Sequence, residues 1–320
     1  MAKDSGWWRR VIPTVLLIPG LIAGSFVLGR LFHGTAKEWA SQLLEALLVI
    51  YGTMVVYSLF ERVRPAGPQK STNANVINLQ VSALYVITTV LAGGLAALLA
   101  AALDRRFHLG WIDLRFAAGK GLVALSAATI LAYLLFDFFY YWFHRLQHTL
   151  PLLWQEHKFH HMDEQLSALT TIRQHWLEDF LRIPVIALPM AVVFKLDQID
   201  PYSLGLGGAI VAIVSGSWAT FIHCNLKVHL GAASRVFVGP QIHRIHHSRL
   251  PQHHDRNFSA YFPIWDVLFG TYYAPARDEF PPTGVDGEKE FKSFGEAMIF
   301  PFREWRKMFE AWRTRTIASA

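Results

Sequence analysis

Histidine is the residue type whose number and spacing stand out in this sequence. The chain has 320 residues and 15 histidines, most of which lie between His144 and His254. Eight of them form three short clusters: His144-Arg-Leu-Gln-His148, His157-Lys-Phe-His160-His161 and His243-Arg-Ile-His246-His247. Neutral imidazole is a ligand that suits iron, copper, zinc and nickel. The clusters therefore predict binding of transition metals.

The spacing within the clusters places their rings together. On a helix each residue advances by about 100°, so His144 and His148 lie about 40° apart on one face. In each His-x-x-His-His cluster the three rings fall within an arc of roughly 100°. Packed together without a metal, such rings would leave polar groups unpaired or would repel one another when protonated. Eight rings exceed the ligands of one ion, so we expect two metal ions.

Two further histidines are weaker candidates for the same site. His175 precedes Glu178 by about one helical turn, and Glu178 could orient the ring or bind metal itself. His223 ends an apolar stretch, in the sequence His223-Cys-Asn225, where a polar ring often marks a site at a membrane surface. A plain interfacial histidine explains each of them equally well.

An acidic and an aromatic residue lead into the first cluster. Asp137, Tyr141, His144 and His148 follow the spacing i, i+4, i+7, i+11, which makes one stripe along a helix. Asp137 is an acid within an apolar stretch, and we expect it to hydrogen-bond a metal-binding histidine. A hydrogen bond between two helices is the alternative.

The composition indicates that helices embedded in a membrane position the histidine clusters. Hydrophobic residues make up 52% of the chain and charged residues 17%, against about 25% charged in typical soluble domains. Apolar stretches occupy residues 11–29, 43–60, 76–103 and 121–143, and about 20 such residues cross a bilayer core. We expect four transmembrane helices before His144. The first stretch also fits a signal peptide or an interfacial helix.

The rest of the chain is more polar and is predicted to cap these helices. Residues 144–275 form the histidine-rich catalytic region, interrupted at about 183–222 by two apolar stretches that we interpret as a short re-entrant hairpin. Residues 276–320 form a basic C-terminal cap. The number of spans places residue 144 in the cytosol, although the basic loop 104–120 argues against this orientation. The prediction is an all-α integral membrane protein, a single domain with a cytosolic, helical, two-metal cap.

Charge and cysteine content narrow the possible partners. The net charge of +6 comes from basic residues scattered over loops, which fits anionic lipid headgroups better than nucleic acid. The single cysteine, Cys224, excludes an intrachain disulfide and a cysteine-rich zinc or iron–sulfur site.

The residues around the clusters carry a family resemblance. They include Asp137-Phe-Phe-Tyr-Tyr-Trp-Phe-His-Arg145, Thr171-Ile-Arg-Gln-His175 with Glu178, His223-Cys-Asn225, Asn257-Phe, and Trp265-Asp-Val-Leu-Phe-Gly-Thr271. Together with the three clusters, over about residues 130–275, they resemble the fatty acid hydroxylase/sterol desaturase superfamily of membrane di-iron enzymes. The chain departs from that pattern in having Trp176 instead of the usual proline and Ser259 instead of the common glycine.

The resemblance implies a lipid hydroxylase or desaturase that uses O₂ and two iron ions, for which zinc could substitute in purified protein. It implies that the eight clustered histidines are ligands, with His175 and His223 carried over less securely. Asn225, Asn257 and Asp266 would support the site or the cap. No haem-binding His-Pro-Gly-Gly element occurs, so we expect a separate electron donor (a cytochrome b5-like protein, a ferredoxin or a reductase). The expected location is a bacterial cytoplasmic membrane or the endoplasmic reticulum of a eukaryote.

Other classes of protein also combine histidines with membrane spans. A metal transporter, or a metal-binding protein without oxidase activity, is the main alternative, although transporters place their ligands near the middle of the membrane. A membrane zinc hydrolase is disfavoured because the His-Glu-x-x-His motif is absent. A structural family member that has lost activity stays possible. No residue separates hydroxylation, desaturation and ether cleavage, so all three stay open at this point.

Overall fold

The computed structural model describes residues 36–69, 71–113, 122–195 and 217–318, and this part of the chain is built from helices. Its only β-structure is three isolated bridges. The all-α prediction is confirmed for these residues. The elements are α2 (Ala36–Val63), α3 (Thr72–Phe107), α4 (Leu122–Thr149), α5 (Pro151–His161), η2 (Ala168–Ile172), α6 (Glu178–Val193), η4 (Gly231–Arg235), α8 (Pro240–His246), η5 (Pro251–His253), α9 (Ile264–Leu268) and α10 (Phe294–Ala318).

Two of the described helices are long and apolar enough to cross a membrane. They are Ala74–Phe107 within α3 and Ser126–Thr149 within α4, which match the third and fourth predicted spans. Only 24% and 22% of their apolar windows is buried, whereas the core helix of a soluble protein would be mostly buried. The second predicted span, 43–60, lies within α2, and the first, 11–29, lies outside the described residues.

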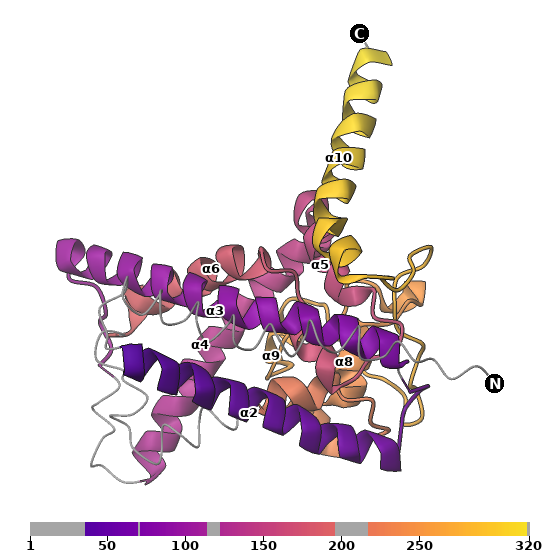
Figure 1. Ribbon diagram of the computed structural model, residues 1–320. Helices are drawn as coiled ribbons and strands as arrows, with labels where there is room; N and C mark the ends of the chain where they lie inside the picture. Colours follow the sequence, from indigo (N-terminus) through magenta and orange to yellow (C-terminus); the bar gives the residue numbers. More distant parts are fainter. Residues whose placement is uncertain (1–35, 70, 114–121, 196–216, 319–320) are drawn as a thin grey trace.

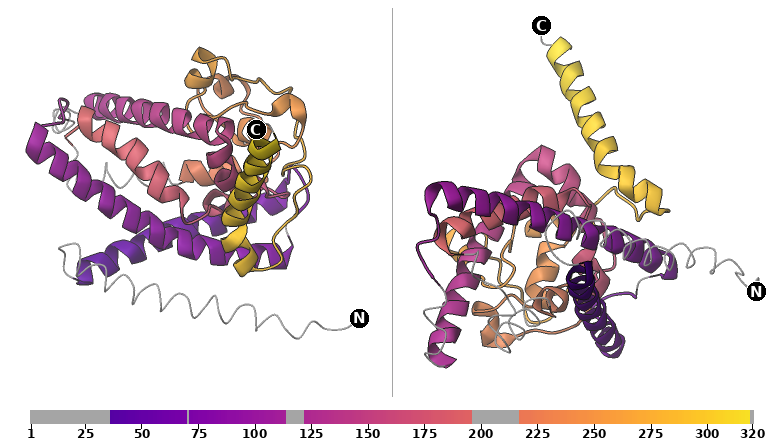
Figure 2. Two further views of the ribbon diagram at one scale, coloured as in Figure 1. Left: turned by 90° about the horizontal axis from the view of Figure 1, so that it is seen from above. Right: turned by 60° about the vertical axis from the view of Figure 1, so that its left-hand side comes forward.

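Helix α6 lies between α3 and α4 and packs against both (Figure 2). It runs parallel to α3, because Tyr85 donates a hydrogen bond to Asp179 at its start and Gly110 donates one to the Val192 carbonyl at its end. The first limb of the predicted hairpin therefore reaches the far end of α3, deeper than expected. Pro184 and Pro189 lie inside α6 without ending it. Residues 196–216 of the hairpin lie outside the described part.

The junction of α4 and α5 folds two histidine clusters onto each other. Pro151 occupies the first turn of α5, where its missing N–H and fixed φ suit the start of a helix but end the preceding one. After this break α5 packs back against α4. The 157–161 cluster thereby faces His144 and His148.

A hydrophobic core joins the cap to the membrane helices. Phe159 from α5 and Phe300 from α10 pack with Ile77 and Val81, which lie near the start of α3. Beyond this core, α10 leaves the body of the protein and runs roughly perpendicular to α3 (Figure 1). The core therefore fixes helix α5, which carries three of the clustered histidines, to the end of a membrane-length helix.

Candidate metal centre

Four segments bring nine histidines together in two groups. Helix α4 contributes two rings, α5 three, the helical segment 217–223 one, and α8 with its C-cap three. In each group one ring nitrogen of every member lies within 4.8 Å of the others. The first group is His144, His148, His157, His161 and His246, and the second is His160, His223, His243 and His247.

The Nε2 atoms of these rings point at one another. In the first group, Nε2 of His144 lies 3.0 Å from Nε2 of His157. In the second, Nε2 of His223 lies 3.2 Å from that of His160 and 2.9 Å from that of His243. The rings of His161 and His247 stack with centroids 4.3 Å apart, so the two groups lie side by side.

Backbone carbonyl groups fix the orientation of four rings. Nδ1 lies within hydrogen-bonding distance of a carbonyl oxygen in His144 (Phe258, 2.7 Å), His160 (Arg173, 3.0 Å), His223 (Ala219, 2.8 Å) and His246 (Arg256, 2.9 Å). A carbonyl only accepts, so Nδ1 must carry the proton in each ring. These carbonyl partners have no signal in the sequence, because any residue type can supply one.

Burial keeps such rings neutral. It holds the pKa of His160 and His246 well below the usual value and lowers the pKa of His223 to about 4. A neutral ring with its proton on Nδ1 has a lone pair on Nε2. In His246 this Nε2 is buried without a hydrogen-bond partner.

This arrangement fits metal ions and not hydrogen bonds. The Nε2 atoms of His160 and His223 both carry lone pairs, so at 3.2 Å neither can donate to the other and they repel. A cation between them removes the repulsion and satisfies both atoms. The residues present therefore fit two metal ions, one for each group.

The structure places His175 outside both groups. Its Nε2 lies 3.1 Å from the Met298 carbonyl oxygen, and its Nδ1 accepts a hydrogen bond from the Leu177 amide. Both nitrogens thus have partners within the cap. Glu178 instead lies near the first group, with Oε2 3.7 Å from Nδ1 of His157. Burial raises the pKa of Glu178 to about 7.

Asp137 does not hydrogen-bond a histidine, which corrects the prediction made for it. Its carboxylate accepts hydrogen bonds from the backbone amides of Ala260, Tyr261 and Phe262 at 2.8–3.3 Å. These amides of a passing loop satisfy a buried carboxylate on α4. The same loop supplies the Phe258 carbonyl, so Asp137 acts on His144 only through the loop.

The other predicted acid and the tyrosine hold the same loop. Asp266 accepts from the amides of Phe258 at 2.8 Å and Ser259 at 3.0 Å, and from the Thr271 hydroxyl at 2.8 Å. The hydroxyl groups of Tyr141 and Thr271 lie 3.0 Å apart. These contacts attach the loop to α4 and α9.

The side-chain amides of the two predicted asparagines each pair with the backbone N–H and C=O of another residue. Asn225 pairs with both the amide (2.9 Å) and the carbonyl (3.0 Å) of Gly67, and a Cβ at Gly67 would lie 2.6 Å from the Arg244 side chain. Asn257, with φ of 57°, pairs in the same way with the amide and carbonyl of Tyr273. Both side chains bind backbone groups of neighbouring segments, and neither hydrogen-bonds a grouped histidine.

Two cavities that differ in polarity reach the centre. An apolar cavity of about 530 Å³ between α3, α4 and α6 is lined by Ile186, Met190 and, at one end, His223. A more polar one of about 360 Å³ is lined by His148, His161 and His246 together with Asp255 and Asp286. The second histidine group therefore faces an apolar space, and the first faces a polar one.

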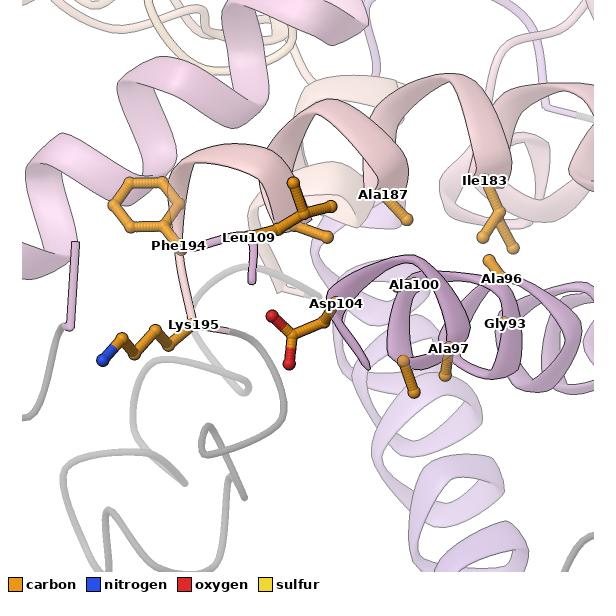
Figure 3. Close-up of a pocket in the computed structure, with 12 residues that line it drawn as sticks. Gly93, Ala96, Ala97, Ala100, Asp104, Leu109, Ile183, Ala187, Phe194 and Lys195 are labelled. Carbon is orange, nitrogen blue, oxygen red and sulfur yellow. The ribbon is translucent and has the colours of Figure 1, made fainter. Parts of the chain in front are cut away.

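The apolar cavity continues away from the histidines. A further cavity of about 290 Å³ shares Ile183 and Ala187 with it and follows small residues of α3 to Asp104 and Lys195 (Figure 3). Tyr85 lines the first cavity and Asp104 the second. At about 1.5 Å per helical residue they lie about 28 Å apart along α3.

Two helices long and apolar enough to cross a membrane, together with two groups of converging, neutral histidines, are features of a membrane protein suited to binding a pair of metals. Residues 129–271, which contain all nine grouped histidines, match the fatty acid hydroxylase family model. Through this region, which is less than half of the chain, the protein is similar to the fatty acid hydroxylase family.

Curated proteins are similar to parts of this chain. The ornithine lipid hydroxylase OlsE of Rhizobium tropici is 29% identical over 184 residues, which cover 57% of this chain and 53% of that protein. An alkylglycerol monooxygenase of Danio rerio is 32% identical over 185 residues (56% and 38%), and one of Homo sapiens is 30% identical over 146 residues (45% and 30%). The chain thus matches about half, or less, of the length of these relatives. No solved structure matches.

The two groups predict the metal content of the protein. After anaerobic loading with ferrous iron, we expect two ions per chain by mass spectrometry of the metal, one for each group. His243→Ala removes a member of the second group. Changes to residues that only support metal ligands lower metal affinity by about 10–100-fold, and we expect this variant to lower the affinity of the second group by more than that. The control is His108→Asn, at an exposed position distant in sequence from both groups. One ion or fewer in the unmodified protein, or an equal loss in the control, would contradict the assignment.

The contacts of Asp266 predict its contribution to stability. In Asp266→Asn an NH₂ group replaces one carboxylate oxygen and faces a group that also donates. The variant also loses the negative charge that strengthens the remaining hydrogen bonds. We expect the free energy of unfolding in detergent to fall by about 3 kcal/mol. The exposed Asp278→Asn should leave it unchanged. Equal stability of the two variants would show that the carboxylate does not hold the loop.

Proposed function

We propose that this protein is a membrane-bound oxygenase that hydroxylates or desaturates a C–H bond of a lipid, using O₂, two iron ions and electrons from a separate protein. The observation that carries the proposal is the apolar cavity whose wall includes His223, a member of the second histidine group. When bound, a pair of iron ions supplies the O₂ activation and C–H cleavage that side chains cannot perform. The names of the relatives, a lipid hydroxylase and alkylglycerol monooxygenases, support a lipid as substrate.

The apolar cavity suits the hydrocarbon part of a lipid. Its volume of about 530 Å³ lies within the usual range of ligand sites, about 300–1,000 Å³. Ile183, Ile186 and Met190 offer apolar contacts that exclude water, and Arg182 lines the same space and could meet a polar group. Because the cavity lies between membrane-length helices, a lipid can enter it from the bilayer without crossing water.

The polar cavity suits the other reactants. It places His148, His161 and His246 within reach of water on the side away from the lipid. We assign electron and proton delivery to this side, which we place in the cytosol. Separate access keeps water away from the lipid and lets a donor protein act without displacing it. The donor belongs to the classes expected from the sequence.

Comparative lipid mass spectrometry tests the reaction directly. Cells that contain the protein should hold a lipid whose mass is raised by an oxygen atom or lowered by two hydrogen atoms, relative to cells without it. His160→Ala should abolish the change, because its Nε2 belongs to the second group. No altered lipid, combined with metal uptake by vesicles that contain the protein, would favour a transporter instead.

The junction of the two apolar cavities predicts a variant that affects substrate binding alone. Ala187 lines both cavities, so Ala187→Phe should block the passage between them. We expect at least about a tenfold fall in kcat/KM for long-chain lipids, equivalent to about 1.4 kcal/mol, with metal content retained. The control is Val185→Phe, because Val185 is 47% exposed on the same helix. Full activity of Ala187→Phe would exclude the passage as the substrate path.

A further inference from the structure

Helix α10 carries apolar side chains that the body of the protein leaves exposed. Phe302, Trp305, Phe309 and Trp312 follow the spacing i, i+3, i+7, i+10, which places them on one face within an arc of about 80°. Phe302, Phe309 and Trp312 are 44%, 54% and 67% exposed. A projecting helical segment of this length is marginal in water unless its apolar face is covered.

Basic residues accompany the apolar face. Between Arg303 and Arg315 the sequence contains five basic and two acidic residues. Arg306 and Arg313 border the stripe on the helical projection, and the side chain of Arg306 is 73% exposed. Apolar and aromatic residues on one face, with arginine and lysine beside them, are typical of helices that lie in the interface of an anionic membrane.

The position of α10 selects the membrane as the surface that covers it. Phe300 packs against Ile77 and Val81, so α10 begins level with the first turns of the apolar segment Ala74–Phe107. From there it runs roughly perpendicular to α3 and leaves the body sideways (Figures 1 and 2). Taken relative to α3, α10 lies along the membrane plane, whereas α4 runs obliquely to α3 (Figure 1).

The apolar stripe of α10 begins next to the residues that precede α6. The Phe302 ring lies 5.9 Å from that of His175 and 6.5 Å from that of Trp176, which directly precede α6. Helix α6 runs from there alongside the apolar part of α3. The stripe thus begins beside the residues that lead into α6.

From these observations we propose that residues 302–314 of α10 form an interfacial helix that docks on the anionic surface of the same bilayer, with Phe302, Phe309 and Trp312 inserted among the lipids. The docking is independent of the reaction at the metal centre.

Site-directed spin labelling tests the depth of the helix. The only native cysteine, Cys224, is 2% exposed, so a nitroxide can be attached selectively to Phe309→Cys or to its neighbour Glu310→Cys. Glu310 lies about 100° further round the helix, outside the stripe. Both side chains are exposed, so neither substitution should disturb folding. The full-length protein is placed in nanodiscs with and without anionic lipid and in detergent.

The ratio of collision rates with oxygen and with a water-soluble nickel chelate reports depth, because oxygen concentrates in lipid. In anionic nanodiscs we expect this ratio to be several-fold higher for Phe309→Cys than for Glu310→Cys, and the difference to shrink in zwitterionic nanodiscs. Equal, water-like ratios at both positions would overturn the proposal. Protection of the Phe309→Cys label from both reagents in detergent as well would also overturn it, by showing that protein, such as a second copy of the chain, covers the stripe.

Discussion

The structure depends on holding neutral imidazole rings inside the protein with the lone pairs of their Nε2 atoms pointed at one another. Neutral rings would turn outward to donate and accept hydrogen bonds if they were free to do so. Here carbonyl groups of Arg173, Ala219, Arg256 and Phe258 accept the Nδ1 protons and fix four rings. These carbonyls come from three segments, since Arg256 and Phe258 lie in the same loop, and each segment must be held by its own contacts. Asp137 and Asp266 do this for the 257–262 loop by binding its amides.

The histidine clusters were predictable because helical spacing alone decides which rings share a face. The eight clustered rings all lie in one group or the other. His223 and His175 looked alike in sequence, since each stood alone, and only tertiary packing separates them. His223 ends a helix beside His160, whereas His175 turns toward the Met298 carbonyl. Which carbonyl meets which ring depends on loop paths that residue types do not specify.

The path of α6 was harder to predict for a different reason. The two apolar stretches suggested a short hairpin that turns back, and the two prolines inside α6 each remove a backbone donor and disfavour a helix interior. Packing between α3 and α4 outweighs that preference, and the chain continues to the loop after α3. Between membrane helices, neighbouring groups can satisfy the carbonyls that proline leaves without partners. The depth of α6 is what gives the apolar cavity its length.

Contacts between α5 and α10 connect the candidate metal centre to the proposed interfacial helix. Lys158 lies between His157 and His160 on α5, and its ammonium group pairs with Glu304 of α10 at 3.0 Å. Trp305 donates a hydrogen bond to the Leu152 carbonyl at the other end of α5. Helices α5 and α10 therefore behave as one unit that is packed on the start of α3. If α10 rests on the membrane surface, the histidines of α5 are held at a constant depth, and a lipid in the apolar cavity meets the centre at a constant distance from its polar end.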